Sequence, residues 1–206
     1  MRPVLVCLHM QKIILASQSP RRKALLELAR VPFEIVVKGT DESFPSDVPI
    51  EQVPVYIARQ KALEVEKYLD NAFHQEHAHQ SIMAADTVVV LGTTIINKPQ
   101  NRRDAVDMLA ALGGKKHRVI TGVVFLHNGQ ETSFYDITEV EFHPLSIDQI
   151  EFYVDECEPY DKAGAYAIQE WIGAIGIKCI NGDFYNVMGL PISRVVQHLK
   201  KMGLLD

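Results

Sequence analysis

The sequence predicts an α/β protein built on a mixed sheet, and two observations carry this prediction. Segments with helical periodicity alternate along the chain with short runs rich in β-branched residues, which is typical of strands connected through helices. Hairpin signals at Gly92 and at Asn128–Gly129 separate neighbouring strand runs, so some strand pairs must be antiparallel. With 206 residues, 47% of them hydrophobic, the chain can bury a substantial core. We expect an N-terminal tail over 1–11 and a single domain over 12–206, with Met10 as an alternative start.

The N-terminal elements follow from local signals. The run IIL at 13–15 predicts a strand, and a helix is expected from about 20 to 30, with Ser19 as N-cap and Pro20 as its first residue. The run FEIVV at 33–37 predicts a short extended segment. The segment KGTDESFPSDVP that follows is rich in turn formers, which indicates a loop before the next helix.

The middle of the chain continues this alternation. We expect a helix over about 51–70, a polar surface loop over 71–80, and a hairpin within 81–99 whose turn lies near Gly92. Asn101 then predicts the start of a helix as its N-cap, and a pair of glycines follows the last helical residue.

The C-terminal third contains further helix and hairpin signals. Two strands at about 117–127 and 132–142 flank the sequence HNGQ, which favours a tight hairpin. Ser146 and Gln149 have the spacing of a capping box and predict another helix. A last hairpin is expected around NGD at 181–183, before a terminal helix in LPISRVVQHLKKMG.

Composition excludes several classes of protein. The formal net charge of −5 argues against a nonspecific nucleic-acid binder, which needs a broad basic face. The three cysteines form no CxxC pair, which favours a reducing compartment over a disulfide framework or a zinc site. No apolar run reaches the length of a membrane span, and the apolar part of the N-terminus is too short for a signal peptide. We therefore expect a cytoplasmic protein. The histidines His74, His77 and His79 lie in a polar loop without matching carboxylates, so no metal site is expected there.

Three cations crowd the start of the first helix. Arg21, Arg22 and Lys23 occupy the first turn, where the helix dipole already places partial positive charge, so their repulsion should be unfavourable. One interpretation is a capped helix with solvated arginines. The other is an anion site, in which Ser17, Ser19, the backbone amides of the first turn and both guanidiniums converge on a phosphate. Because a bound phosphate would turn the repulsion into attraction, we expect the two arginines to need an anionic ligand.

Asp86 stands within the otherwise apolar run SIMAADTVVVL. Burying a lone carboxylate costs several kcal/mol, so such a residue is usually hydrogen-bonded, bound to a metal or placed at a strand end. A structural aspartate that closes a turn is an equally good interpretation of this residue alone. Asp41 and Glu42 lie in a separate loop, and acidic residues from separate loops suit Mg²⁺ or Mn²⁺ bound to a polyphosphate.

Three further polar residues have simple structural interpretations when taken singly. Lys61 lies on the apolar stripe of its helix, where a lysine whose ammonium reaches water is common. Lys98 precedes a proline in a turn, where a solvated lysine is the default. Gln169 follows small and apolar residues and fits a structural amide as well as a ligand contact.

Taken together, these segments resemble a known family. The strings LASQSPRR, TDES, ARQKA, AADTVVV, NKP, DKAGAYAIQ and INGDFYNVMGLP resemble, in order and spacing, the Maf (septum-formation-like) nucleoside triphosphate pyrophosphatases. The resemblance covers about residues 12–203. It implies an elongated mixed sheet with helices and two lobes around a central cleft, similar to the inosine triphosphate pyrophosphatases, and often a homodimer. It also implies hydrolysis of a nucleoside triphosphate between the α and β phosphates, helped by a divalent cation such as Mg²⁺, Mn²⁺ or Co²⁺.

The resemblance also implies roles for individual residues. Asp86 matches the proton acceptor for the attacking water, and the residues that match the phosphate and metal contacts are Ser17, Arg22, Glu42, Lys61 and Lys98. The metal would lie at Glu42 and Asp86. Arg21, Thr87 and Gln169 match the positions that set base preference, and Arg21 and Gln169 are similar to the residues of the branch acting on dTTP and UTP.

One departure from the family pattern lies beside the base-preference residues. Glu170 and Trp171 follow Gln169, where the family commonly has glycine after the glutamine. An amide offers a donor and an acceptor to the 4-oxo and N3–H edge of a pyrimidine, but a free amide can rotate, so discrimination against cytosine needs neighbours that fix it.

Two other functions are compatible with the sequence. One is a housecleaning pyrophosphatase on the same fold, acting on purine nucleotides, 7-methyl-GTP or modified bases. The other, suggested by the name of the family, is a non-catalytic regulator of cell division that binds a partner or DNA, although the acidic net charge argues against DNA.

Overall fold

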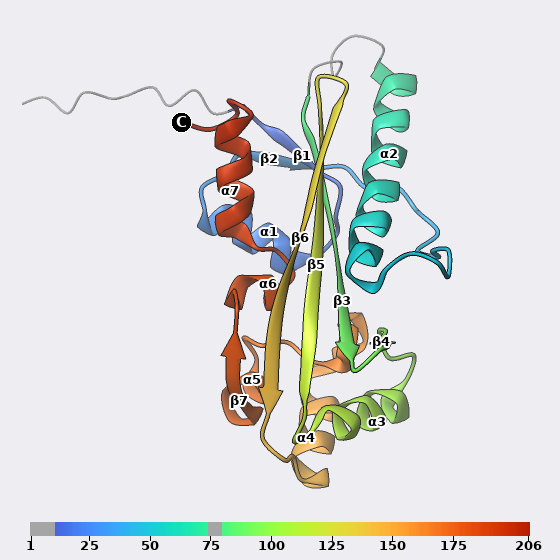
Figure 1. Cartoon of the computed structure of the whole chain (residues 1–206), viewed down its shortest axis with the longest axis vertical. Helices are drawn as coiled ribbons and strands as arrows, with labels where there is room; N and C mark the ends of the chain where they lie inside the picture. The colour runs from blue at the N-terminus through green and yellow to red at the C-terminus, as the bar shows by residue number, and fades with distance from the viewer. Residues whose placement is uncertain (1–10, 74–79) are drawn as a thin grey trace, which may run out of the picture.

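The computed structural model describes residues 11–73 and 80–206 and contains one mixed sheet of seven strands (Figure 1). The strand order is β2-β1-β3-β5-β6-β7, and β4 pairs with β3 beside this path. β1 is parallel to β2 and β3, whereas all other pairs are antiparallel, so the predicted α/β class with a mixed sheet is confirmed. The strands are β1 (Ile13–Leu15), β2 (Phe33–Ile35), β3 (Ile82–Leu91), β4 (Thr94–Ile96), β5 (Lys116–His127), β6 (Gln130–Phe142) and β7 (Ile177–Asn181).

The helices begin largely where the capping signals placed them. Ser19 accepts a hydrogen bond from the backbone amide of Arg22, and Ser146 and Gln149 form both bonds of a capping box. Asn101 likewise caps its helix through the amide of Asp104. The helices are α1 (Pro20–Leu28), α2 (Val53–Phe73), α3 (Arg102–Leu112), α4 (Ile147–Cys157), α5 (Trp171–Gly176), α6 (Phe184–Met188) and α7 (Ile192–Lys201), with 3-10 turns at Ile50–Gln52, Pro159–Asp161 and Ala163–Ala165.

The long strands β3, β5 and β6 run the length of the molecule and join two lobes (Figure 1). Helices α1, α2 and α7 gather around one end of these strands, and α3, α4 and α5 around the other. Each lobe has its own apolar core: Leu25 and Val195 belong to one, and Leu109 and Tyr153 to the other. The elongated two-lobed arrangement expected from the family resemblance is therefore confirmed.

The two faces of β3 are covered by different helices because successive strand residues point to opposite sides. Ile82 and Ala84 pack in a cluster with Ala62 of α2, whereas Met83 and Ala85 pack in the cluster formed by α1 and α7. The register of side chains along β3 therefore decides which helix each residue meets.

One edge of β3 is open in its middle. β1 pairs with β3 at Ile82 and Met83, and β4 pairs with it only from Val89 to Leu91. Residues 84–88 of β3 lie between these two pairings, at the junction of the lobes, and this stretch contains the sequence AADTV.

Both predicted tight turns are present, at Gly92 and at Asn128–Gly129. α2 continues to Phe73, so residues 71–73 are helical rather than part of the predicted polar loop, most of which lies outside the described residues. β2 ends at Ile35 rather than at residue 37.

The hairpin predicted around residues 181–183 is wrong. β7 pairs with β6 instead, and Gly182 leads into α6, whose N-cap is Asp183. The reason is that Asp183 accepts a hydrogen bond from the amide of Tyr185, and this bond starts a helix rather than a second strand.

Some predictions concern residues outside those described. They include the N-terminal tail up to residue 10, the alternative start at Met10, and the histidines His74, His77 and His79. Over the described ranges, no helix combines the length and the apolar character needed to cross a membrane.

Candidate active site

A cleft of about 560 Å³ lies beside the open edge of β3. This size suits a small-molecule ligand. Every residue that the sequence assigned to the site lines this cleft: Ser17, Ser19, Arg21, Arg22, Glu42, Lys61, Asp86, Thr87, Lys98 and Gln169. The sequence therefore identified residues that the fold brings together from six separate segments.

β3 presents Asp86 and Thr87 to opposite sides of the sheet. Asp86 meets Lys61 of α2, whereas Thr87 meets Arg22 of α1. Their neighbours on β5 are Gly122 and Thr121. The two polar residues in the middle of an apolar strand thus connect the strand to two different parts of the site.

Gly122 explains how α2 comes close enough for Lys61 to reach Asp86. A Cβ at this glycine would lie 2.3 Å from the backbone nitrogen of Val55 and 2.4 Å from the carbonyl carbon of Pro54. The first turn of α2 therefore rests directly on the backbone of β5, which any larger residue would prevent.

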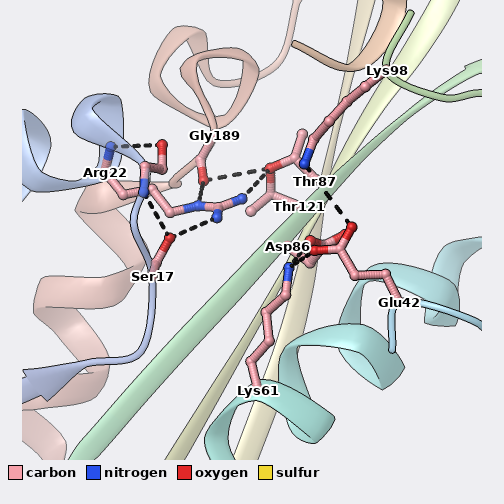
Figure 2. Close-up of polar contacts among 10 residues, drawn as sticks. Ser17, Arg22, Glu42, Lys61, Asp86, Thr87, Lys98, Thr121 and Gly189 are labelled. Atoms are coloured by element: carbon pink, nitrogen blue, oxygen red, sulfur yellow. Dashed lines mark hydrogen bonds and ion pairs between the residues drawn. The ribbon is translucent and has the colours of Figure 1, made fainter. Parts of the chain in front are cut away.

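Lys61 joins the two carboxylates of the site (Figure 2). Its Nζ lies 2.7 Å from Oδ1 of Asp86 and 2.6 Å from Oε1 of Glu42. The Lys61 side chain is only 17% exposed, so it is not the solvated lysine at the edge of an apolar stripe. Lys98 is more peripheral, with Nζ 4.0 Å from Oε2 of Glu42 and 55% side-chain exposure.

The charges in this cluster act on Glu42. Desolvation opposes the charged form of its carboxylate, but the hydrogen bond from Lys61 and the charges of Lys61, Lys98 and Arg22 outweigh that effect and lower its pKa. Glu42 is therefore ionised at neutral pH.

The other acid of the same loop does not take part. Asp41 accepts hydrogen bonds from the amide and the hydroxyl of Ser43, which is a local turn interaction.

Arg22 lies on the opposite side of the cleft and is held by uncharged acceptors (Figure 2). Its Nε donates to the carbonyl of Gly189 at 2.8 Å, Nη1 to Oγ of Ser17 at 3.0 Å, and Nη2 to Oγ1 of Thr87 at 3.0 Å. Burial lowers the pKa of this guanidinium, while the charge of Asp86 raises it. Within the described part of the chain no carboxylate pairs with Arg22, so its charge is available to an anion.

The expectation that both arginines of the SPRR motif await a ligand is wrong for Arg21. Its Nη1 lies 2.9 Å from Oδ2 of Asp161, in the 3-10 turn Pro159–Asp161. Lys23 likewise lies 3.8 Å from Glu27, one helical turn further on. The repulsion in the first turn is therefore largely offset by carboxylates of the protein itself, and only Arg22 has the character of an anion receptor.

Ser19 and Gln169 differ in the hydrogen bonds that their side chains make within the protein. Ser19 accepts the capping bond from the amide of Arg22 at 3.4 Å, so its hydroxyl can still donate to a ligand. Gln169 is exposed to the cleft, and no described residue hydrogen-bonds to its amide. The structure therefore leaves the orientation of that amide to be set by the ligand.

Sequence reasoning missed the residues that support Arg22 and Thr87. Oγ1 of Thr121 lies 2.9 Å from Oγ1 of Thr87 and donates to the carbonyl of Asn186 at 3.1 Å. Gly189 ends α6 with a φ of +114° and turns its carbonyl toward Arg22. The signal for Thr121 was available, because it interrupts an apolar strand as Asp86 does.

The donor set fits a divalent cation held jointly with a ligand. Asp86 and Glu42 come from separate elements and converge within hydrogen-bond distance of one ammonium, and carboxylate oxygens are the donors that Mg²⁺ and Mn²⁺ prefer. Among the described residues, no three acidic, histidine or cysteine side chains gather as a complete metal site. A cation there would therefore need further oxygen ligands from a bound phosphate or from water.

Comparisons with known proteins identify the family of this chain. The family model for Maf-like proteins matches residues 12–202. A relative from Cytophaga hutchinsonii is 47% identical over 95% of this chain and 86% of its own length. Relatives from Halalkalibacterium halodurans and Phocaeicola vulgatus are 46% and 43% identical, over 94% and 95% of this chain and 97% and 98% of their own lengths. All three are named dTTP/UTP pyrophosphatase.

The solved structure of the Staphylococcus aureus Ham1 protein has a similar fold. Its TM-score is 0.53 at 13% identity, and the match covers 94% of this chain and all of that chain. Its sequence is too distant to support more than the fold. The motif order, the cleft at the open edge of β3 and the match over residues 12–202 together show that this chain belongs to the Maf-like protein family.

Proposed function

We propose that the protein hydrolyses dTTP and UTP between the α and β phosphates, which releases the nucleoside monophosphate and pyrophosphate. The observation that carries the proposal is the cleft itself, which holds the carboxylate of Asp86 and the guanidinium of Arg22. Among the described residues, Arg22 donates side-chain hydrogen bonds to uncharged groups only. Relatives at 43–47% identity that are named dTTP/UTP pyrophosphatase support the substrate class.

The cations of the cleft suit a triphosphate. Cleavage of a phosphoanhydride builds negative charge on the leaving pyrophosphate, and preorganised cations stabilise that charge. Arg22 is fixed by three hydrogen bonds and supplies a rigid, forked donor. The Lys98 side chain is exposed and its Nζ lies 4.0 Å from Glu42, so it is free to move toward the phosphates when they bind.

Asp86 is the candidate base. Its carboxylate is held by Lys61 at 2.7 Å, which leaves its other lone pairs free to accept a proton from water. Lys61 is in turn held by Glu42, so the base is oriented through two ion pairs. In the alternative interpretation Asp86 is a metal ligand rather than the proton acceptor.

The cofactor that we propose is Mg²⁺, Mn²⁺ or Co²⁺, held by Glu42 and Asp86 together with substrate phosphates. When bound, such an ion neutralises phosphate charge and acidifies water. The protein residues would still position the triphosphate and the base. We further propose that Arg21, Thr87 and Gln169, which line the cleft, form the base-recognition side.

A nucleotide panel tests the proposal. The wild type should release pyrophosphate and monophosphate from dTTP and UTP faster than from CTP, ATP, GTP or 7-methyl-GTP, in the presence of each of the three cations. Release of inorganic phosphate and a diphosphate instead would show cleavage at the wrong bond. Failure to cleave any of these nucleotides would favour a non-catalytic regulator.

Asp86→Asn separates the role of the base from binding. It keeps the shape of the side chain but cannot accept a proton, so kcat should fall at least ~100-fold. Asp107→Asn is the matched control, because Asp107 is an exposed residue of α3 whose nearest cation lies 3.8 Å away. Near-normal turnover by Asp86→Asn would reject Asp86 as the base.

We place this activity in the cytoplasm, as the cysteine pattern favours, and expect a homodimer on the basis of the family resemblance. Light scattering of the purified protein tests the oligomeric state.

A further inference from the structure

A continuous chain of polar contacts links the SPRR motif to the residue that follows Gln169. Arg21 pairs with Asp161, and the other oxygen of Asp161 lies 2.8 Å from Nζ of Lys162. The same Nζ lies 3.5 Å from Oε1 of Glu170. Oε2 of Glu170 accepts a hydrogen bond from the hydroxyl of Tyr153. Two cationic and two anionic side chains, from residues 21, 161–162 and 170, are thus joined along one side of the cleft.

This chain also holds the backbone that carries Gln169. The hydroxyl of Tyr153 accepts a hydrogen bond from the amide of Ala167 at 3.2 Å, and the amide of Glu170 donates to the carbonyl of Ala167 at 3.1 Å. Both Ala167 and Gln169 line the cleft. The turn 167–170 is therefore fastened at its first residue by Tyr153 and at its last residue by the contacts of Glu170.

Because Tyr153 and Lys162 are buried, the loss of a polar contact by either side chain would not be compensated by water. Tyr153 is fully buried in the core between α3 and α4, and its pKa is raised by burial and by the hydrogen bond to Glu170. The Lys162 side chain is only 10% exposed, so its ammonium depends on Asp161 and Glu170 for compensation. A glycine at position 170 would leave Asp161 as the one described carboxylate beside Lys162 and would leave the hydroxyl of Tyr153 without its acceptor.

We propose that Glu170 is a positioning residue for base selection, which fixes the cleft wall at Ala167–Gln169 through Tyr153 and Lys162. This inference rests on the proposed function. Because no described residue holds the amide of Gln169, selection depends on how firmly the backbone beneath it is placed. A fixed wall rejects a base whose edge does not fit, whereas a wall that shifts accommodates it.

The neighbouring Trp171 gives a readout that does not require turnover. It is the only tryptophan of the chain, it is partly exposed, and its ring packs against Phe152 at 4.9 Å between ring centroids. Nucleotide binding at the adjacent wall should change its fluorescence. Titrations in an Asp86→Asn background would give dissociation constants for dTTP, UTP, CTP and GTP without hydrolysis.

The expected result is a loss of selectivity rather than a uniform loss of affinity. Glu170→Gln should lower the ratio between the worst and the best dissociation constants at least ~5-fold, the effect of about one hydrogen bond. Tyr153→Phe should lower it similarly, and the double variant should lower it no further, because both act through one contact. Glu156→Gln, which removes an exposed carboxylate of α4, is the matched control and should leave the ratio unchanged.

Two results would overturn the inference: an unchanged ratio in both Glu170→Gln and Tyr153→Phe, or a ratio that Glu156→Gln lowers equally. Tyr153→Phe removes a single oxygen, so it keeps the test decisive if Glu170→Gln fails to fold. The proposed function fails separately, if the wild type releases no pyrophosphate or prefers a purine. The selectivity ratio is defined whichever base the wild type binds best.

Discussion

Replacing Lys61 with methionine should tighten the binding of Mn²⁺ to the nucleotide-free protein. The ammonium of Lys61 lies 2.6 Å from Glu42 and 2.7 Å from Asp86, the two carboxylates that we propose as metal ligands. A cation that uses both oxygens must first displace this ammonium. Methionine removes the charge, is nearly as long and favours helices, so it suits position 61 of α2.

The size of the effect follows from Coulomb repulsion. The Lys61 side chain is 17% exposed, so a displaced ammonium stays near the cation. At a separation of about 6 Å and an effective dielectric constant of about 40, charges of +2 and +1 repel by about 3 kcal/mol. This corresponds to ~100-fold in the dissociation constant. Because salt screens part of the repulsion, we expect the affinity to rise at least ~10-fold.

Electron paramagnetic resonance of free Mn²⁺ gives this dissociation constant directly, without nucleotide or turnover. Lys98→Met is the matched control, since it removes the same charge from an exposed side chain 4.0 Å from Glu42. Its effect should stay below ~3-fold. Circular dichroism checks that both variants are folded. Unchanged or weaker Mn²⁺ binding by Lys61→Met, or an equal gain in Lys98→Met, would refute the reasoning.

Three further predictions concern other parts of the structure. Arg22→Lys keeps the charge but can keep only one of three hydrogen bonds, so kcat/KM for UTP should fall ~100-fold at about 1.5 kcal/mol per lost bond. The control is Lys23→Gln, in the same helical turn, which should change kcat/KM less than ~2-fold. A mild effect of Arg22→Lys would contradict the proposed anion site. Gly122→Ala would place a Cβ 2.3 Å from the backbone of α2 and should lower the free energy of unfolding in urea by about 3 kcal/mol. The control is Gly39→Ala, whose added Cβ would have no atom of a described residue within 4 Å and should change that free energy by less than ~0.5 kcal/mol. Equal changes in both variants would exclude the close packing of α2 on β5. Burial lowers the pKa of His117 to about 4. Between pH 6.5 and 4 the histidine is therefore protonated in the unfolded chain but neutral in the folded protein, so stability is lost as pH falls from about 6.5 to 4. Urea titrations should show that this group contributes about 3 kcal/mol of that loss in the wild type and none of it in His117→Phe; parallel losses in both proteins would show that His117 is not held neutral by burial.

The sequence alone determined most of the local structure. Capping bonds at Ser146 and Gln149, and the turn at Asn128–Gly129, involve groups only a few residues apart, so short-range signals were enough to predict them. The same is true of the residue types in the site, because a carboxylate such as Asp86 in an apolar strand requires a partner wherever the chain goes.

Where a sequence signal is compatible with two local structures, the fold determines which one forms. The sequence NGD at 181–183 suits a hairpin turn and a helix N-cap equally, and the outcome depended on the pairing of β7 with β6. The local bond from the amide of Tyr185 to Asp183 starts the helix, whereas the partner of β7 is set by a distant strand, in which Val140 pairs with Ile180.

Only the tertiary structure decided the electrostatic partners. Asp161 lies 140 residues from Arg21 in the sequence, yet its carboxylate offsets the positive charge for which the sequence predicted an anionic ligand. Glu170 and Tyr153 meet behind Gln169 in the same way. Ion pairs and buried hydrogen bonds act over a few ångströms in space, and the distance between two residues in space is fixed by the path of the whole chain. The sequence therefore determined which residues could take part in the chemistry, and the packing of α2 on Gly122 and of α1 beside residue 161 determined which of them meet.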